Sequence, residues 1–274
     1  MTRTGGAAFP AMLASVIRTL TPDDFPTLHR AFADAFSDYI VPMAPTREQL
    51  TEMFTRRGAV LDASVAAFEN DRIVAFTVNC IDGARAYDTG TGVVPSHRRR
   101  GLARELMERS FALVRERGCR EYVLEVLEQN EKAAELYRAC GFVETRRFQC
   151  WTFDAAGEPL ASRGAIHEGW WTLEPSWQNA THSLARARDP QVVLGDDDAY
   201  AVVFPSNGDL PQLAVRPEAR RNKRGTRLLE AAANLAGKPL RILNIDDRDA
   251  GVARFLEHAG ARKTVRQLEM LKLL

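Results

Sequence analysis

The chain has 274 residues, a length that suits two compact domains. Hydrophobic residues make up 45% and charged residues 27%, which is ordinary for a folded globular protein and excludes long disordered regions over most of the chain. The formal net charge of +1 gives no overall attraction to nucleic acid or to a membrane surface, and no apolar run approaches the roughly 20 residues that span a bilayer.

The ends and the cysteines indicate a cytoplasmic protein. Residues 1–15 contain small residues and an apolar stretch that Pro10 interrupts, so we expect a disordered leader and no signal peptide. The cysteines form no CxxC pair and no Cys/His group with zinc-ligand spacing; they are Cys80, Cys119, Cys140 and Cys150. We therefore expect buried, reduced thiols and no metal site.

The first half is predicted to be mixed α/β. A helix starts at Thr21-Pro22-Asp23-Asp24 and runs to about Phe36, and Thr46 opens another in capping-box spacing. Gly118 ends a third helix that starts near Gly101, and Asn130 caps a fourth that stops at Gly141. Strands are predicted at residues 16–20, 64–69, 72–81, 84–94, 121–127 and 142–153.

The second half repeats part of the first. Residues 155–162 are the best linker candidate. Beyond them, five residues of the first half (Pro95, Arg98, Arg99, Ala103, Leu106) recur without a gap as Pro217, Arg220, Arg221, Gly225 and Leu228. A helix at 225–236, a strand at 240–245 and a helix ending at Gly260 follow in the same order. A repeat of this length predicts a duplicated domain.

A basic turn between the strand that ends at Val94 and the helix that starts at Gly101 carries the chemistry. Backbone N–H groups at a helix N-terminus are free to bind an anion, and the helix dipole adds positive charge. Small residues at Gly101 and Ala103 allow a pyrophosphate to approach the backbone, and Arg98, Arg99 and Arg100 surround the turn. The sequence therefore predicts a phosphate site.

Three other interpretations of this segment are weaker. A solvated basic turn leaves the flanking elements unexplained. A dinucleotide fingerprint built on Gly90 and Gly92 has Pro95 in place of its third glycine, and its glycines precede the strand end. A P-loop requires Gly-Lys-Ser/Thr, which the segment lacks.

Two motifs together resemble the GNAT acyltransferase superfamily. Residues 93–103 match V-x-P-x-x-[QR]-x-x-G-x-[GA], with Arg98, Gly101 and Ala103 in the signature positions. Residues 130–142 resemble N-x-x-A-x-x-x-Y-x-x-x-G-F through Asn130, Ala133, Tyr137, Gly141 and Phe142. The resemblance covers roughly residues 15 to 154.

The resemblance implies a mostly antiparallel α/β fold in which two central parallel strands, 87–94 and 121–127, splay apart to admit the pantetheine arm of acetyl-CoA. The implied cofactor-binding residues are Val93, Val94, Arg98, Arg99, Arg100, Gly101, Leu102, Ala103, Arg104, Asn130, Ala133 and Tyr137. Backbone N–H groups near Val93 and Val94 would hold the arm, and those of residues 99–104 the pyrophosphate. Asn130 could serve both as a helix cap and as a cofactor contact.

Three residues are candidates for catalysis. Tyr137 is the implied general acid for the leaving thiolate, although its place on a buried helix stripe also suits a purely structural tyrosine. Glu125 interrupts an apolar strand, where an unpaired carboxylate is costly, so it is a candidate general base. Asp88 is a second candidate base, and a water chain is a third route.

The second copy departs from the pattern. Lys223 stands where Gly101 stands, Leu256 where Tyr137 stands, and Asp249 where Asn130 stands. We therefore expect a catalytic domain at 16–157 and a degenerate GNAT-like domain at 158–274 that has lost catalysis and cofactor binding. Its cluster Arg220, Arg221, Lys223 and Arg224 fits a solvated face or a weak anion site, and its tryptophans Trp170, Trp171 and Trp177 fit packing or a domain interface better than an acceptor pocket.

The first functional hypothesis is an acetyl-CoA-dependent N-acetyltransferase that acts on a primary amine of a small molecule or an N-terminus. A non-catalytic acyl-CoA sensor is the alternative, which the presence of Tyr137 and Gly101 disfavours. A nucleic-acid binder is disfavoured by the net charge. We expect no nucleic-acid or membrane partner, and either a monomer or a homodimer.

Overall fold

The computed structural model describes residues 15–41, 43–155, 157–160 and 163–274. The predicted leader, apart from Ser15, lies outside the described residues, as do residues 156, 161 and 162 of the predicted linker. No helix within the described part of the chain is long and apolar enough to cross a membrane.

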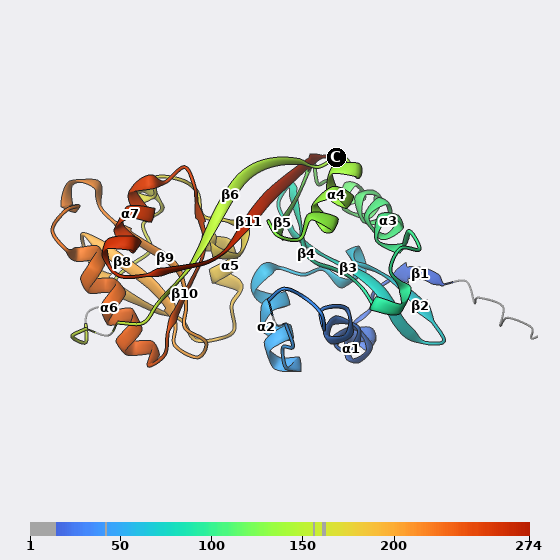
Figure 1. The fold of residues 1–274 in the computed structure, drawn as a ribbon, viewed down its shortest axis with the longest axis horizontal. Helices are drawn as coiled ribbons and strands as arrows, with labels where there is room; N and C mark the ends of the chain where they lie inside the picture. Colours follow the sequence, from blue (N-terminus) through green and yellow to red (C-terminus); the bar gives the residue numbers. More distant parts are fainter. Residues whose placement is uncertain (1–14, 42, 156, 161–162) are drawn as a thin grey trace, which may run out of the picture.

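One continuous sheet runs through the described molecule (Figure 1). Its strand order is β1-β2-β3-β4-β5-β11-β6-β10-β9-β8-β7. The strands are β1 (Val16–Thr19), β2 (Val65–Glu69), β3 (Arg72–Asp82), β4 (Arg85–Val93), β5 (Glu121–Leu127), β6 (Val143–Phe153), β7 (Val192–Asp196), β8 (Ala199–Phe204), β9 (Asp209–Val215), β10 (Leu240–Asp246) and β11 (Arg262–Leu273). The strands predicted in the first half are confirmed to within about a residue at each end.

The two halves exchange their last strands. The strand β11, from the end of the chain, pairs antiparallel with β5 of the first half, and β6 pairs antiparallel with β10 of the second half. The strands β6 and β11 also pair with each other and run together between the two lobes in Figure 1. The two expected sheets are therefore joined into one, and each half is completed by a strand that belongs to the other in sequence.

Helices cover both faces of this sheet. The α-helices are α1 (Phe25–Ala35), α2 (Arg47–Arg57), α3 (Leu102–Glu116), α4 (Glu131–Ala139), α5 (Thr181–Arg186), α6 (Arg224–Ala236) and α7 (Ala250–His258). The 3-10 turns are η1 (Pro22–Asp24), η2 (Leu61–Ala63), η3 (Pro95–His97), η4 (Glu168–Trp170), η5 (Trp177–Asn179) and η6 (Pro217–Ala219). The helix predicted from Thr21 to Phe36 thus begins as a 3-10 turn before α1.

Alternation along the strands decides which helix covers which face. Ala66 and Phe68 of β2 pack in one core cluster with α1 and α2, whereas Val65 and Ala67 pack in another with Leu106 of α3. This is the two-residue period of a strand that is buried on both sides.

Local signals place the helix ends as predicted. The Thr46 side chain accepts a hydrogen bond from the Gln49 N–H at 3.2 Å, and Gln49 Oε1 accepts from the Thr46 N–H at 2.9 Å, which completes the capping box of α2. The Asn130 side chain caps α4 by accepting from the Ala133 N–H at 3.3 Å.

The predicted splay is present in both halves. The strands β4 and β5 pair in parallel only from Arg85↔Glu121 to Asp88↔Leu124 and diverge beyond that point. The strands β9 and β10 pair in parallel only at Arg241↔Asp209. A bulge in β4 at Thr89, between the pairs Val78↔Gly90 and Asn79↔Asp88, lies at the start of the first gap.

The repeat extends to the backbone conformation of the two basic turns. Arg99 and Arg221 have φ of 62° and 68°, and Gly101 and Lys223 have φ of 84° and 58°. The caps also match, because the Asp249 side chain accepts from the Val252 N–H at 3.0 Å as Asn130 does from Ala133. The two turns therefore have the same backbone conformation despite their different residues.

Candidate functional site

The turn between β4 and α3 is an exposed helix N-terminus. Gly101 is the N-cap residue of α3 in the left-handed conformation, and no atom lies within 4 Å of the position that a Cβ on Gly101 would occupy. The first N–H groups of α3, in Leu102, Ala103 and Arg104, have no partner within the helix. The geometry thus leaves open space beside free backbone donors, which suits an anionic group.

The arginines of this turn have different roles from those expected. Arg98 donates to Asp38 at 2.6 and 2.7 Å, to the Ala35 carbonyl at 3.0 Å and to the Val93 carbonyl at 3.2 Å. It therefore ties the end of α1 to the end of β4, and the carboxylate of Asp38 neutralises it. The hydrogen bond with Asp38 raises the pKa of Arg98 above its ordinary value.

Two of the three predicted arginines remain near the anion site. Arg100 donates to the Ser96 carbonyl at 2.9 Å and lies 4.0 Å from Glu69. Arg99 is exposed and makes no ion pair with any residue that the structure describes. The positive potential at the turn therefore comes mainly from Arg99, Arg100 and the N-terminus of α3.

Of the two N–H groups at the end of β4 expected to contact the pantetheine arm, one is already bonded within the sheet. The Val94 N–H donates to the Val74 carbonyl of β3 at 3.0 Å, so the prediction that this N–H serves the pantetheine arm is wrong. Successive N–H groups of a strand point to opposite sides, so that of Val93 is directed toward the gap between β4 and β5.

Tyr137 and Asp88 lie together on the face of the sheet that α3 and α4 cover. Tyr137 is buried in the cluster that contains Met107, Leu124 and Phe142. Asp88 pairs with Leu124 in the parallel ladder, so both side chains point to this face. Asp88 accepts hydrogen bonds from the Gly90 N–H at 2.8 Å and the Thr91 hydroxyl at 2.7 Å.

Burial governs the protonation of both groups. Burial raises the pKa of Asp88 to about 6, against hydrogen bonds from Thr91, Gly90 and Tyr137 that lower it. Burial, and then the nearby charge of Asp88, raise the pKa of Tyr137 well above its ordinary value. Tyr137 is therefore a protonated hydroxyl at neutral pH, which suits a proton donor.

Glu125 faces the opposite side of the sheet. Its Oε2 accepts hydrogen bonds from the Asn244 amide at 2.6 Å, the Gln178 amide at 3.0 Å and the Tyr87 hydroxyl at 3.2 Å. Its Oε1 is covered from solvent and has no hydrogen-bond partner among the described residues. Burial raises the pKa of Glu125, while Arg57 lowers it.

The two candidate bases are therefore separated by the sheet. Asp88 lies beside the candidate acid Tyr137, whereas Glu125 lies on the opposite face, with Tyr87, Gln178 and Asn244. Because Asp88 pairs with Leu124, the side chains of these two residues share one face of the sheet. Glu125 is the next residue of β5, so its side chain points to the other face.

Residues outside the two motifs complete the surroundings of Glu125. Trp177 stacks on Tyr87 with ring centroids 5.1 Å apart and donates to the Arg57 carbonyl at 2.9 Å, which confirms its predicted packing role at the boundary of the halves. Gln178 follows it in η5, and Asn244 occupies the β10 position that corresponds to Glu125 of β5. Extending the internal repeat along β5 would have pointed to Asn244; no sequence signal pointed to Gln178.

The tail of α1 also reaches the motif region. Tyr39 lies beside Asn130, and burial raises the pKa of Tyr39. Neither Tyr39 nor Asp38 belongs to either motif, so the sequence did not predict them as neighbours of the site.

Comparison with known proteins identifies the family. Residues 25–142 match the model of the Acetyltransferase (GNAT) family. The chain is 30% identical over 108 residues to Aminoglycoside N(6')-acetyltransferase type 1 of Klebsiella aerogenes, which covers 38% of this chain and 71% of that protein. The chain belongs to the GNAT family of acetyltransferases.

Solved structures extend the likeness to the whole chain. A putative acetyltransferase from Pyrococcus horikoshii is similar with a TM-score of 0.70 at 18% identity, over 99% of this chain and 94% of that one. A tandem GNAT protein from the clavulanic acid biosynthesis pathway is similar with a TM-score of 0.66 at 17% identity, over 94% of this chain and 98% of that one. These likenesses show the fold, which is that of two GNAT units in tandem.

Proposed function

We propose that this protein is an acetyl-CoA-dependent N-acetyltransferase that transfers an acetyl group to a primary amine by direct attack. The observation that carries the proposal is the gap between β4 and β5, which has the open turn at Gly101 at one end, Tyr137 on one face and Glu125 on the other. We assign the reaction to the first half, residues 16–157, completed by β11.

The cofactor contacts follow from the geometry of the turn. The N–H groups at the start of α3 hold the pyrophosphate, with Arg99 and Arg100 alongside. The Val93 N–H holds the pantetheine arm. Asn130 and Ala133, at the start of α4, flank the site. Acetyl-CoA supplies the activated acetyl thioester.

The proton transfers are divided between the two faces of the sheet. The Glu125 carboxylate accepts a proton from the acceptor ammonium, and the free amine forms a bond to the carbonyl carbon. The carbon–sulfur bond breaks, and the Tyr137 hydroxyl donates its proton to the leaving sulfur. The nitrogen loses its second proton to water as the amide forms. Asp88, beside Tyr137, orients that hydroxyl and takes part in restoring its proton.

The acceptor is proposed to be an amine on a small polar molecule or an N-terminus. The relative from Klebsiella aerogenes is named as an acetyltransferase of aminoglycosides, which supports amines on small molecules. The presence of Tyr137 and the open space at Gly101 favour a catalyst over an acyl-CoA sensor.

A screen of primary amines against the full chain, following free thiol release from acetyl-CoA, tests the proposal. With an accepted amine, Glu125→Gln should lose most turnover, and Glu121→Gln on the same face of β5 should retain it. Absence of acetyl-CoA binding would contradict the proposed function. Full turnover by Glu125→Gln would contradict the assignment of Glu125 as the base.

A further inference from the structure

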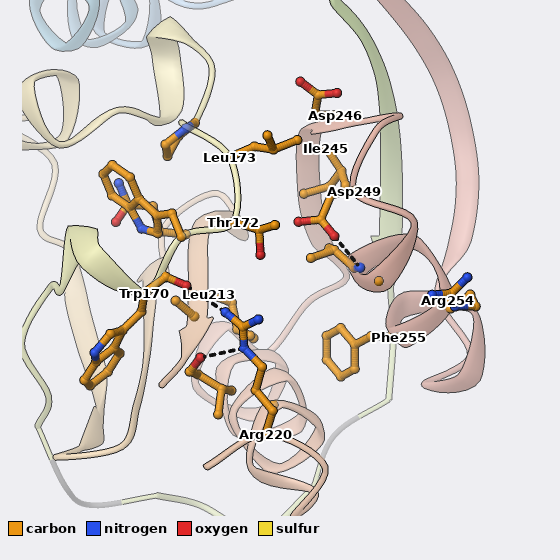
Figure 2. A pocket seen from close by; sticks show the side chains of 18 of the residues that line it. Trp170, Thr172, Leu173, Leu213, Arg220, Ile245, Asp246, Asp249, Arg254 and Phe255 are labelled. Atoms are coloured by element: carbon orange, nitrogen blue, oxygen red, sulfur yellow. Dashed lines mark hydrogen bonds between the residues drawn. The ribbon is translucent and has the colours of Figure 1, made fainter. Parts of the chain in front are cut away.

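A cavity of about 710 Å³ lies in the second half. One of its lining residues, Asn244, also donates to Glu125 of the site proposed above. The cavity occupies the gap that opens between β9 and β10 beyond their single parallel pair, Arg241↔Asp209. Figure 2 shows this cavity between the segment from Trp170 to Leu173, the strand β9 and the start of α7. Its volume is typical of pockets that enclose small organic molecules.

The walls of the cavity are largely apolar. Leu173, Leu213, Ile245 and Phe255 face one another across it in Figure 2, and Trp171 adds an aromatic surface whose indole N–H is already bonded to the Tyr200 hydroxyl at 2.6 Å. A cavity with these walls favours a ligand with an apolar body.

One end of the cavity carries uncompensated positive charge. Arg220 retains the two backbone contacts of Arg98, to the Val215 carbonyl at 3.1 Å and the Trp170 carbonyl at 2.9 Å. It lacks a counterpart of Asp38, and Arg220, Arg221 and Lys223 make no ion pair with any described residue. Three cations therefore border the cavity beside the N-terminus of α6.

Two acidic residues of the lining, Asp246 and Asp249, lie at the other end and are engaged, whereas the third, Glu174, makes no ion pair with a described residue. Asp246 pairs with Arg248 at 2.7 Å, and the Asp249 side chain caps α7. Figure 2 places both of them across the cavity from Arg220. The distribution of charge therefore directs an anionic group of a ligand toward Arg220.

The start of α6 has less open space around its backbone than the start of α3. Lys223 carries a side chain where Gly101 leaves open space. The Phe255 ring lies 3.3 Å from the position of a Cβ on Gly225, in the first turn of α6. Side chains therefore crowd the approach to the backbone at α6, whereas that approach is open at α3.

We propose that the second-half cavity binds a small organic anion, with an apolar body between Trp171 and Phe255 and a single phosphate or carboxylate group at Arg220, Arg221 and Lys223. The ligand is not the acyl donor. The second copy has thus exchanged a cofactor site for a separate ligand site.

Calorimetry on the full chain tests this, with phenyl phosphate and phenylacetate as probes for the two anionic groups. With acetyl-CoA present at saturation to fill the anion site at α3, we expect saturable binding of at least one probe, with one site per chain. The variant Arg221→Glu/Lys223→Glu should weaken it by at least about tenfold, because two cations beside the anionic group become carboxylates that repel it. The matched control Arg99→Glu changes the residue equivalent to Arg221 in the first half and should leave probe affinity unchanged. Leu213→Trp, which fills the cavity without altering its charge, should abolish binding.

Three results would overturn the proposal. One is the absence of saturable binding of either probe at millimolar concentration. A second is equal weakening by Arg99→Glu. A third is binding of two acetyl-CoA molecules per chain with displacement of the probe, which would make the cavity a second cofactor site. Thermal unfolding of each variant identifies any loss of the fold.

Discussion

Gly101 is the residue at which the two copies of the basic turn differ most clearly. It has φ of 84° and open space around a potential Cβ, whereas Lys223 occupies the equivalent left-handed position with φ of 58°. The second half therefore shows that a lysine is compatible with this turn. Gly101→Lys should convert the first turn into the second without unfolding the protein.

The cost of this change to stability can be worked out from the backbone. A non-glycine residue in the left-handed region costs about 1–2 kcal/mol. Replacing glycine also removes about 0.5–1 kcal/mol of entropy that the unfolded chain would otherwise gain. No steric clash adds to this, because no atom lies within 4 Å of the new Cβ. The net loss should be about 1 kcal/mol, or a few degrees in Tm.

The effect on acetyl-CoA should be larger than the effect on stability. The lysine side chain would fill the space above the N–H groups of α3, so we expect at least about a tenfold loss of affinity in calorimetry, equivalent to about 1.4 kcal/mol. Gly101→Ala has the same backbone cost with little bulk and should bind more tightly than Gly101→Lys. Lys223→Gly should leave acetyl-CoA affinity unchanged. Unaltered affinity in a folded Gly101→Lys protein would refute the placement of the pyrophosphate at α3.

Three further predictions concern the groups on either face of the gap. Tyr137→Phe should lower kcat by about 10²–10⁴ with acetyl-CoA affinity near wild type, because it removes only the proton donor; a loss of about 1 kcal/mol in stability with normal turnover would mean a structural tyrosine. Asp88 binds its proton more tightly in the folded state, with a pKa of about 6 against an ordinary 3.8, so its contribution is most favourable at low pH and about 3 kcal/mol of stability is lost as pH rises through 6. Asp88→Asn should remove that part of the pH dependence in chemical unfolding, and an identical slope in the variant would contradict the burial argument. Asn244→Ala removes a donor that lowers the pKa of Glu125, so the acidic limb of the pH–rate profile should move to higher pH. Ser176→Ala, which removes only the second acceptor of the same Asn244 amide at 3.1 Å, should leave the limb in place. If the acidic limb of Asn244→Ala stays in place, that limb does not report the ionisation of Glu125.

The sequence by itself predicted most secondary-structure elements, the anion-binding turn and the duplication. These features depend on interactions between residues a few positions apart. The capping boxes, the glycine in a left-handed position and the alternation of a strand act within one element, so they are visible in the order of residues. The repeat was recognised in the same way, because the residues that segment 217–228 shares with segment 95–106 keep the same spacing.

Only the tertiary structure decided which strands are neighbours and which side chains meet. The strand β5 could pair with β6 or with β11, because both are long antiparallel partners that offer the same backbone hydrogen bonds, and no residue pattern distinguishes them. The placement of Asp88 with Tyr137, and of Glu125 with Asn244, depends on the register of strands that are far apart in the chain. A shift of one residue would move each carboxylate to the other face, and that register is set by packing over the whole sheet.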